Sequence, residues 1–324
     1  MDDLLQEIED LLRARPDIPP HLFGSYTRCA ASSVRHVLSG AKPMGPTVAR
    51  ELQRVLHLVK RGEILRPAQD AASASVRKAR EFYVTQNVRE ISQVLTFCAE
   101  QAKIGVISGE YGIGKTEAIQ FWRTHAGLDV PNLNFQFSEF TSRNIVDFIS
   151  QLGELFDLPP NRARGRGGKI FRQICDSLCD DPLLLIFDQA EAVAPRVLQV
   201  IRELWDCTRH AGVGVVVLGS PLLIERMRDT RMRDVGALAS RVGVWAALRG
   251  VSREEVADII RQEGIRDIDE AAFNLLWRAT GGSMRRLMAV TDLLAAKHAG
   301  KAVTEKTLAG VAGHLWGIDW GKAA

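Results

Sequence analysis

Five short apolar runs punctuate the middle of the chain, and stretches with apolar residues at helical spacing separate them. Runs of this length are typical of strands that are buried on both faces, as in a parallel sheet between two layers of helices. The pattern therefore predicts a three-layer α/β core over residues 81–247. The predicted strands cover residues 103–108, 133–138, 183–188, 213–219 and 242–246.

The N-terminal residues 1–66 favour a small, separate helical domain with prolines between its first helix and the rest. Within it, residues 27–40 have the pattern of the second half of a helix-turn-helix that ends at Gly40. The apolar residues of this segment would face inward; they are Ala30, Val34, Val37 and Leu38. The polar residues would face a DNA groove; they are Ser32, Ser33, Arg35 and His36. A plain helical bundle that contacts other proteins is the alternative.

The pattern becomes wholly helical after the core. Residues 67–80 are typical of a linker or a connecting helix, residues 248–314 of a helical lid, and residues 315–324 of a tail. Ser252 and Glu255 have the spacing of a capping box before the first lid helix, and Gly264 would end that helix.

The composition is that of an ordinary globular protein, with 46% hydrophobic and 25% charged residues. The five cysteines form no CxxC pair and no zinc-type cluster, so we expect a reducing cytoplasm and no metal other than Mg²⁺. The acidic N-terminus and the lack of an apolar run of about 20 residues argue against secretion and membrane insertion.

Positive charge is concentrated in two segments. Residues 21–66 carry eight basic and two acidic groups, and residues 160–175 carry five basic groups without an acid. Such segments bind phosphate backbones or form solvated loops. The second contains Arg162, Arg164, Arg166, Lys169 and Arg172.

Residues 109–116 match GxxxxGKT, between a predicted strand and a predicted helix. In such a loop the glycines let backbone N–H groups surround phosphates, the lysine neutralises them, and the threonine hydroxyl holds Mg²⁺. The helix that follows adds its positive N-terminal dipole. The segment therefore predicts an ATP site with Mg²⁺, formed by Gly109, Gly112, Gly114, Lys115, Thr116 and Glu117.

Asp188 ends a buried apolar strand, where it would reach the phosphate loop and organise Mg²⁺ together with Thr116. ATPases of this plan have a glutamate next, which polarises the attacking water, but here the residue is Gln189. An amide cannot accept the proton of water, so we expect weakened hydrolysis with nucleotide binding retained. Either Gln189 is an engineered substitution, which its near-isosteric size favours, or Glu191 or another group partly replaces the base.

Together these motifs resemble the transposition ATPases of the AAA+ superfamily, the family of the phage Mu transposition protein B and, more distantly, of the TnsC and TniB regulators. The most similar part runs from Phe82 to Ala118. The resemblance implies that the segment containing Thr85 contacts the nucleotide base and that Arg285 contacts the nucleotide from the lid. It also implies that Arg241 is an arginine finger for a neighbouring subunit, with Arg226, Arg228, Arg231 and Arg233 as competitors. Ser220 stands where the family has a sensor asparagine.

The resemblance also implies a function. Proteins of this type assemble on double-stranded DNA as helical ATP-bound filaments, bind without sequence preference, select the transposition target and deliver it to a DDE transposase. The predicted loop over residues 139–144 would line the DNA channel through Thr141, Ser142 and Arg143. The arginines at positions 162, 164 and 166 are second candidates.

An ATP-gated regulator or interaction switch, with a DNA-reading N-terminal domain, fits the same nucleotide motifs. Such a regulator would lose specific DNA binding when residues 1–66 are removed. A helicase or translocating motor is disfavoured, because the chain has no additional helicase-like motifs.

Overall fold

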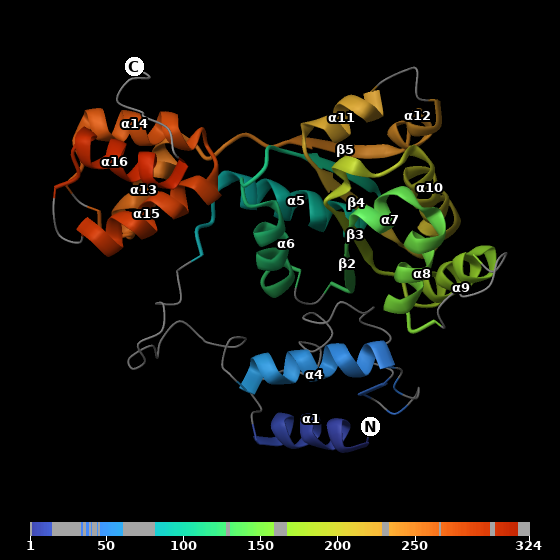
Figure 1. Ribbon diagram of the computed structural model, residues 1–324. Helices are drawn as coiled ribbons and strands as arrows, with labels where there is room; N and C mark the ends of the chain where they lie inside the picture. Colours follow the sequence, from blue (N-terminus) through green and yellow to red (C-terminus); the bar gives the residue numbers. More distant parts are fainter. Residues whose placement is uncertain are drawn as a thin grey trace.

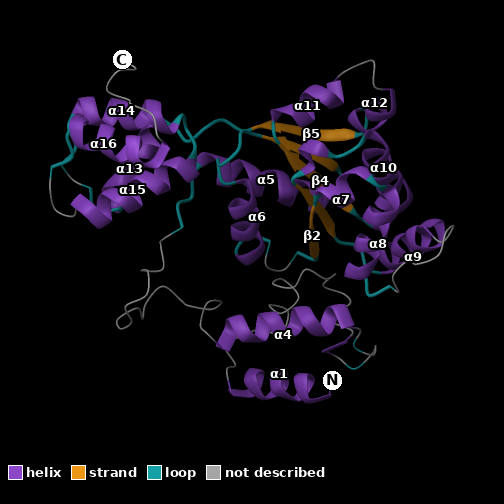
Figure 2. Ribbon diagram, viewed as in Figure 1, coloured by secondary structure: helices purple, strands orange, loops and turns teal. Residues whose placement is uncertain are grey.

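The computed structural model describes residues 2–14, 34, 37–38, 40, 44, 46–60, 82–127, 130–158, 167–228, 233–265, 267–298 and 302–316. Among these residues, five parallel strands form one sheet in the order β2-β3-β4-β1-β5. Figure 2 shows the sheet in orange among the purple helices. The strands are β1 (Ile104–Ser108), β2 (Asn132–Gln136), β3 (Leu184–Asp188), β4 (Gly214–Gly219) and β5 (Val242–Ala247). Each begins and ends within one residue of its predicted run, except β2, which ends two residues earlier.

Alternate residues of the central strands enter two different cores, as the period of two in a strand requires. In β3, Leu184 and Ile186 pack on one side with α5 (Gln86–Gln101) and α6 (Lys115–Thr124). Leu185 and Phe187 pack on the other side, beneath a second layer of helices. That layer contains α8 (Ile145–Leu155), α9 (Gly167–Asp180), α10 (Pro195–Thr208), α11 (Pro221–Arg228) and α12 (Arg233–Ala239).

In the described residues after β5, four helices enclose a core of their own and form the lid (Figure 1). They are α13 (Arg253–Gln262), α14 (Glu270–Thr280), α15 (Met284–His298) and α16 (Glu305–Trp316). The predicted capping box is present, because the Ser252 hydroxyl accepts from the Glu255 backbone and the Glu255 carboxylate from the Ser252 backbone. Helix α16 continues two residues into the predicted tail.

At the N-terminus, α1 (Asp2–Ala14) and α4 (Pro46–Lys60) pack together around the buried Ile8 and Leu52. Most of the predicted helix-turn-helix segment, residues 27–40, lies outside the described residues. In the part of the chain that the structure describes, no helix is both long and apolar enough to cross a membrane.

One predicted loop is wrong. Residues 139–143 form a short helix, α7 (Glu139–Arg143), because Ser138 caps it through a box with Thr141. The described part of the core also has a 3-10 turn after β3, η1 (Ala190–Ala192), and another after α10, η2 (Arg209–Ala211).

Candidate nucleotide site

The phosphate-loop motif follows β1 at the carboxyl edge of the sheet and leads into α6, where ligands of parallel sheets bind. Gly112 and Gly114 have φ values of 80° and 95°, a region that favours glycine. The Lys115 ammonium donates to the carbonyls of Gly109 and Glu110, at 2.6 and 3.0 Å. The exposed Glu117 lies in the first turn of α6. The loop thus has the backbone shape that a phosphate cradle requires.

The loop and the end of β3 meet through a hydrogen bond. Thr116 Oγ1 donates to Asp188 Oδ2 at 2.7 Å, and the other carboxylate oxygen accepts from the backbone N–H of Gln189 at 2.8 Å. The Asp188 side chain is almost completely buried, with 1% of its surface exposed. A hydroxyl beside a carboxylate is an oxygen donor set that suits Mg²⁺, which takes its other ligands from phosphate and water. The residues therefore fit the cation that the motif predicts.

Burial lowers the pKa of the Lys115 ammonium from its ordinary value of 10.5, and the positive charge of Arg285 lowers it further. Nearby carboxylates oppose this shift, with the largest contribution from Glu191 and the next from Asp188. Glu191 and Arg285 are far from Lys115 in sequence, yet both act on its ammonium group. The fold thus brings a second carboxylate and an arginine to the phosphate loop.

Gln189 begins the η1 turn with φ at 62° and exposes its side chain. The turn is held from α11, because Arg226 donates to the carbonyls of Glu191 and Val193, both at 2.7 Å. Sequence reasoning included Arg226 only as a competing arginine finger, and nothing local distinguishes it from its neighbours. Its two donors are directed at the backbone of its own chain, so it fixes the position of Glu191.

The lid contacts the phosphate loop directly. The backbone N–H of Arg285 donates to the Gly112 carbonyl at 2.9 Å. A Cβ added to Gly112 would lie 2.7 Å from the Ser283 hydroxyl. Where the chain enters the lid, Val251 N–H donates to the Gly282 carbonyl at 2.9 Å. Arg285 therefore lies where a lid residue can contact a bound nucleotide.

The segment before α5 joins the core to the lid. Thr85 is buried and caps α5 by accepting from the Val88 N–H at 3.4 Å. Asn87 donates to the Arg249 carbonyl at 2.7 Å, and the Tyr83 hydroxyl donates to Glu263, which directly follows α13. Ser220, at the end of β4, is also buried. The Thr85 hydroxyl therefore has a structural partner as well as the predicted place beside the nucleotide site.

Arg241 lies apart from these groups, between α12 and β5 at the amino edge of the sheet. Of its competitors, Arg228 lies over the Trp245 ring, with its guanidinium carbon 5.8 Å from the centroid. Arg231 and the side chain of Arg233 lie outside the described part. Arg241 therefore does not join the nucleotide site of its own chain.

The predicted DNA-channel residues need a correction. Thr141 and Ser142 are 4% and 2% exposed, and their hydroxyls bond to Ser138 and Glu139 within the α7 cap. Their side chains are therefore directed inward. Arg143 is 74% exposed, and the neighbouring Phe140, which the sequence analysis did not select, is 81% exposed. The arginines at positions 162, 164 and 166 lie outside the described residues, and Lys169 is exposed on α9.

A family model described as an AAA domain matches residues 98–227. The ATP-dependent target DNA activator B of Escherichia phage Mu is 27% identical over 191 residues, which are 58% of this chain and 58% of that protein. The Mu-like prophage FluMu DNA transposition protein B of Haemophilus influenzae is 26% identical over 215 residues, covering 65% of this chain and 71% of that protein. This chain therefore aligns with little more than half the length of the phage Mu protein.

Two solved structures have a similar fold. Cdc6p from Pyrobaculum aerophilum aligns with a TM-score of 0.51 at 16% identity, covering 71% of this chain and 66% of that chain. The Aeropyrum pernix ORC2 protein, solved in ADPNP–ADP complexes, aligns with a TM-score of 0.50 at 17% identity, covering 74% of this chain and 70% of that chain. At this identity the similarity concerns the fold alone. The predicted AAA+ core with a C-terminal helical lid is confirmed.

Proposed function

Because residues 98–227 match the AAA domain and the chain is similar to the two B proteins, we propose that it is an ATPase that assembles on double-stranded DNA when ATP is bound and selects the target for transposition. The observation that carries the nucleotide part is the convergence of Lys115, Thr116 and Asp188, with Arg285 reaching them from the lid. The DNA and transposition parts are supported by the similarity to the two B proteins.

ATP binding would exchange one set of partners for another. The Lys115 ammonium would leave the carbonyls of Gly109 and Glu110 for phosphate oxygens, which offer a full negative charge in place of a dipole. Mg²⁺, held by Thr116 and Asp188, would neutralise phosphate charge and orient the phosphates. Arg285 would bond to the nucleotide from the lid, so that the angle between lid and core responds to ATP.

Hydrolysis would be slow in the present chain. Gln189 can orient a water molecule but cannot take its proton. The Glu191 carboxylate can take a proton, and it lies close enough to the phosphate loop for its charge to act on the Lys115 ammonium. Arg226 holds the backbone of Glu191 in that position. We propose that Glu191 supplies the residual base activity.

DNA binding would use the carboxyl edge of the sheet beyond the nucleotide. Arg143 is exposed on α7, with only a loose ion pair to Glu139 at 3.8 Å that a DNA phosphate can replace. Phe140 exposes its ring next to it, a group suited to apolar contact with the sugars of the backbone or with a neighbouring copy. Arg162, Arg164 and Arg166 are further candidates. Contacts to phosphate make binding independent of sequence and strongly dependent on salt.

The biological role follows from similarity alone. The protein would form a helical filament with ATP, deliver the bound DNA to a DDE transposase, and leave the DNA after hydrolysis. Arg241 of each copy would complete the ATP site of its neighbour, so that turnover is a property of the assembly.

The test is binding of the full chain to unrelated double-stranded DNA fragments with ATP, with ADP and without nucleotide, followed by electron microscopy of the same samples. We expect filaments on every fragment with ATP only, and none for Lys115→Ala. Nucleotide-independent filaments in that variant would refute the gating by ATP. Binding to particular sequences that is lost without residues 1–66 would favour the regulator.

A matched pair of variants tests the DNA surface. Arg143 and Arg13 both have side chains that are 74% exposed, and both pair with a glutamate four residues earlier in a helix. Arg143→Ala should weaken ATP-dependent DNA binding and reduce its salt dependence by about one ion. Arg13→Ala should change neither the DNA affinity nor its salt dependence. Equal losses of DNA affinity in both variants would mean that α7 is not part of the DNA-binding surface.

A further inference from the structure

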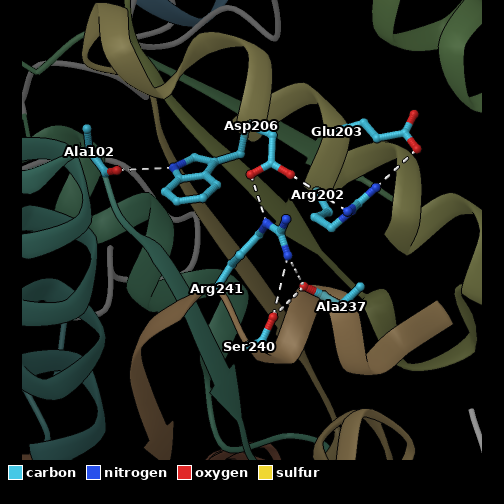
Figure 3. Close-up of polar contacts among 8 residues, drawn as sticks. Ala102, Arg202, Glu203, Asp206, Ala237, Ser240 and Arg241 are labelled. Atoms are coloured by element: carbon cyan, nitrogen blue, oxygen red, sulfur yellow. Dashed lines mark hydrogen bonds and ion pairs between the residues drawn. The ribbon is translucent and has the colours of Figure 1, made fainter. Parts of the chain in front are cut away.

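Arg241 is held by hydrogen bonds to its own chain, at the start of β5 (Figure 3). Its Nε donates to Asp206 Oδ1 at 2.8 Å, and its Nη1 donates to the Ala237 carbonyl at 2.9 Å. A weaker contact joins Nη1 to the Ser240 hydroxyl at 3.4 Å. The guanidinium plane therefore has a defined orientation.

The bonds leave part of the guanidinium available. The Arg241 side chain is 33% exposed, and among the described residues its Nη2 has no hydrogen-bond partner. An arginine bound to its own chain through Nε and one Nη can still donate from its other edge to an oxyanion. Arg241 is thus oriented but not enclosed.

The carboxylate that orients Arg241 belongs to a rigid element. Asp206 lies near the end of α10. Its neighbour Trp205 is buried, and the Trp205 indole N–H donates to the Ala102 carbonyl at 3.1 Å. Arg202, one turn earlier on α10, lies 3.8 Å from the other oxygen of Asp206 (Figure 3). The carboxylate therefore has little freedom to follow a moving arginine.

We propose that Asp206 is a positioning residue that holds Arg241 ready for the γ-phosphate of the ATP bound to a neighbouring copy. The inference rests on the proposed function, in which Arg241 acts in trans. A long arginine side chain that is ordered before assembly loses less conformational entropy when it meets the phosphate, which raises the rate of turnover rather than the affinity for ATP. The opposite role, in which Asp206 restrains Arg241 until assembly, predicts a faster enzyme when the carboxylate is removed.

The experiment compares Asp206→Asn with Arg241→Ala in the full chain, using steady-state release of the γ-phosphate over a range of ATP concentrations on saturating DNA. We expect kcat to fall about tenfold in Asp206→Asn, the size of effect of a lost orienting contact, with KM for ATP unchanged. In Arg241→Ala, kcat should fall about 10³-fold or more. Asp206→Glu should fall between wild type and Asp206→Asn, because it keeps the charge and moves the acceptor by one methylene.

Asp258→Asn is the matched control, since Asp258 pairs with Arg261 at 2.6 Å on the exposed face of the lid. It should leave kcat unchanged. Wild-type turnover in Asp206→Asn, together with a defect in Arg241→Ala, would overturn the positioning role, and faster turnover would make Asp206 a restraint. If Arg241→Ala also hydrolyses ATP at the wild-type rate, Arg241 is not an arginine finger. The formation of filaments with ATP would then still test the proposed function separately. Should Asp206→Asn fail to fold, Asp206→Glu must still lower kcat at constant KM.

Discussion

Replacing Gly282 with alanine would add a methyl group where two backbone segments of the lid junction meet. The new Cβ would lie 2.8 Å from Gly250 Cα, 3.2 Å from Gly250 C and 3.3 Å from Val251 N. All three are backbone atoms, so no side-chain rotation can relieve the contact. Gly282 also has a φ of 74°, which alanine adopts at a cost.

The neighbouring glycine separates these two effects. Gly281 has a φ of 55°, but a Cβ there would have no atom within 4 Å. Gly281→Ala should therefore cost only the left-handed conformation, about 1 kcal/mol. Gly282→Ala should add overpacking of about 1–3 kcal/mol and so cost about 2–4 kcal/mol in total. Gly250→Ala meets the same contact from the other side, at 2.9 Å from Gly282 Cα, without a positive φ.

The free energies come from urea unfolding of each variant, and nucleotide affinity from titration with a fluorescent ATP analogue. We expect Gly282→Ala to weaken both folding and ATP binding, since displacement of Ser283 and Arg285 would break the lid contact to Gly112. Gly281→Ala should retain ATP binding. Equal unfolding free energies in the two variants would refute the close approach of the backbones as the cause.

Three other predictions concern single groups. Gln189→Glu should raise DNA-stimulated ATP turnover about 10²-fold or more and shorten filament lifetime, whereas Glu191→Gln should lower the turnover of the present chain. A phosphate-release assay measures both turnover rates. Unchanged turnover in both variants would mean that neither residue 189 nor residue 191 acts as the general base. Because the protonated Lys115 binds phosphate and its pKa lies below 10.5, ATP affinity should fall as pH rises through the lowered pKa, with a flat profile for Lys115→Arg. Over that window the unfolded chain binds more protons at this group than the empty folded protein, so its contribution to stability should rise with pH while ATP affinity falls. Burial raises the pKa of Cys98 to about 12, so native protein should alkylate at the exposed Cys207 and not at Cys98; rapid labelling of Cys98 in peptide mass spectra would mean that the core opens.

Local patterns predicted the parts of the protein that local forces decide. The strands follow from apolar runs, because any buried strand between two helical layers must be apolar on both faces. The phosphate loop follows from its glycine spacing, and the first lid helix from a capping box whose two partners are three residues apart. The signal for a strand is the composition of one short run, and the partners in the phosphate loop and the capping box are only a few residues apart in the chain.

Helix α7 shows where local reasoning failed. Its five residues have too few positions for a helical period, and Thr141 and Ser142 have the polarity of loop residues. Their hydroxyls instead satisfy the cap and the backbone of a short helix packed against η1 and α8, which left Phe140 and Arg143 exposed. Polarity predicted the chemistry of these side chains but not the direction in which they point.

By itself, the sequence determined the order of the elements, the phosphate loop and the carboxylate that ends β3. Only the tertiary structure decided which distant groups meet them: Glu191 and Arg285 at Lys115, Arg226 at the η1 turn, Gly282 at Gly250, and Asp206 at Arg241. The physical reason is that a hydrogen bond or a close backbone contact depends on distances of a few tenths of an ångström, which the packing of the elements sets. A pattern along the chain contains the spacing of residues within an element, and not the distance between elements.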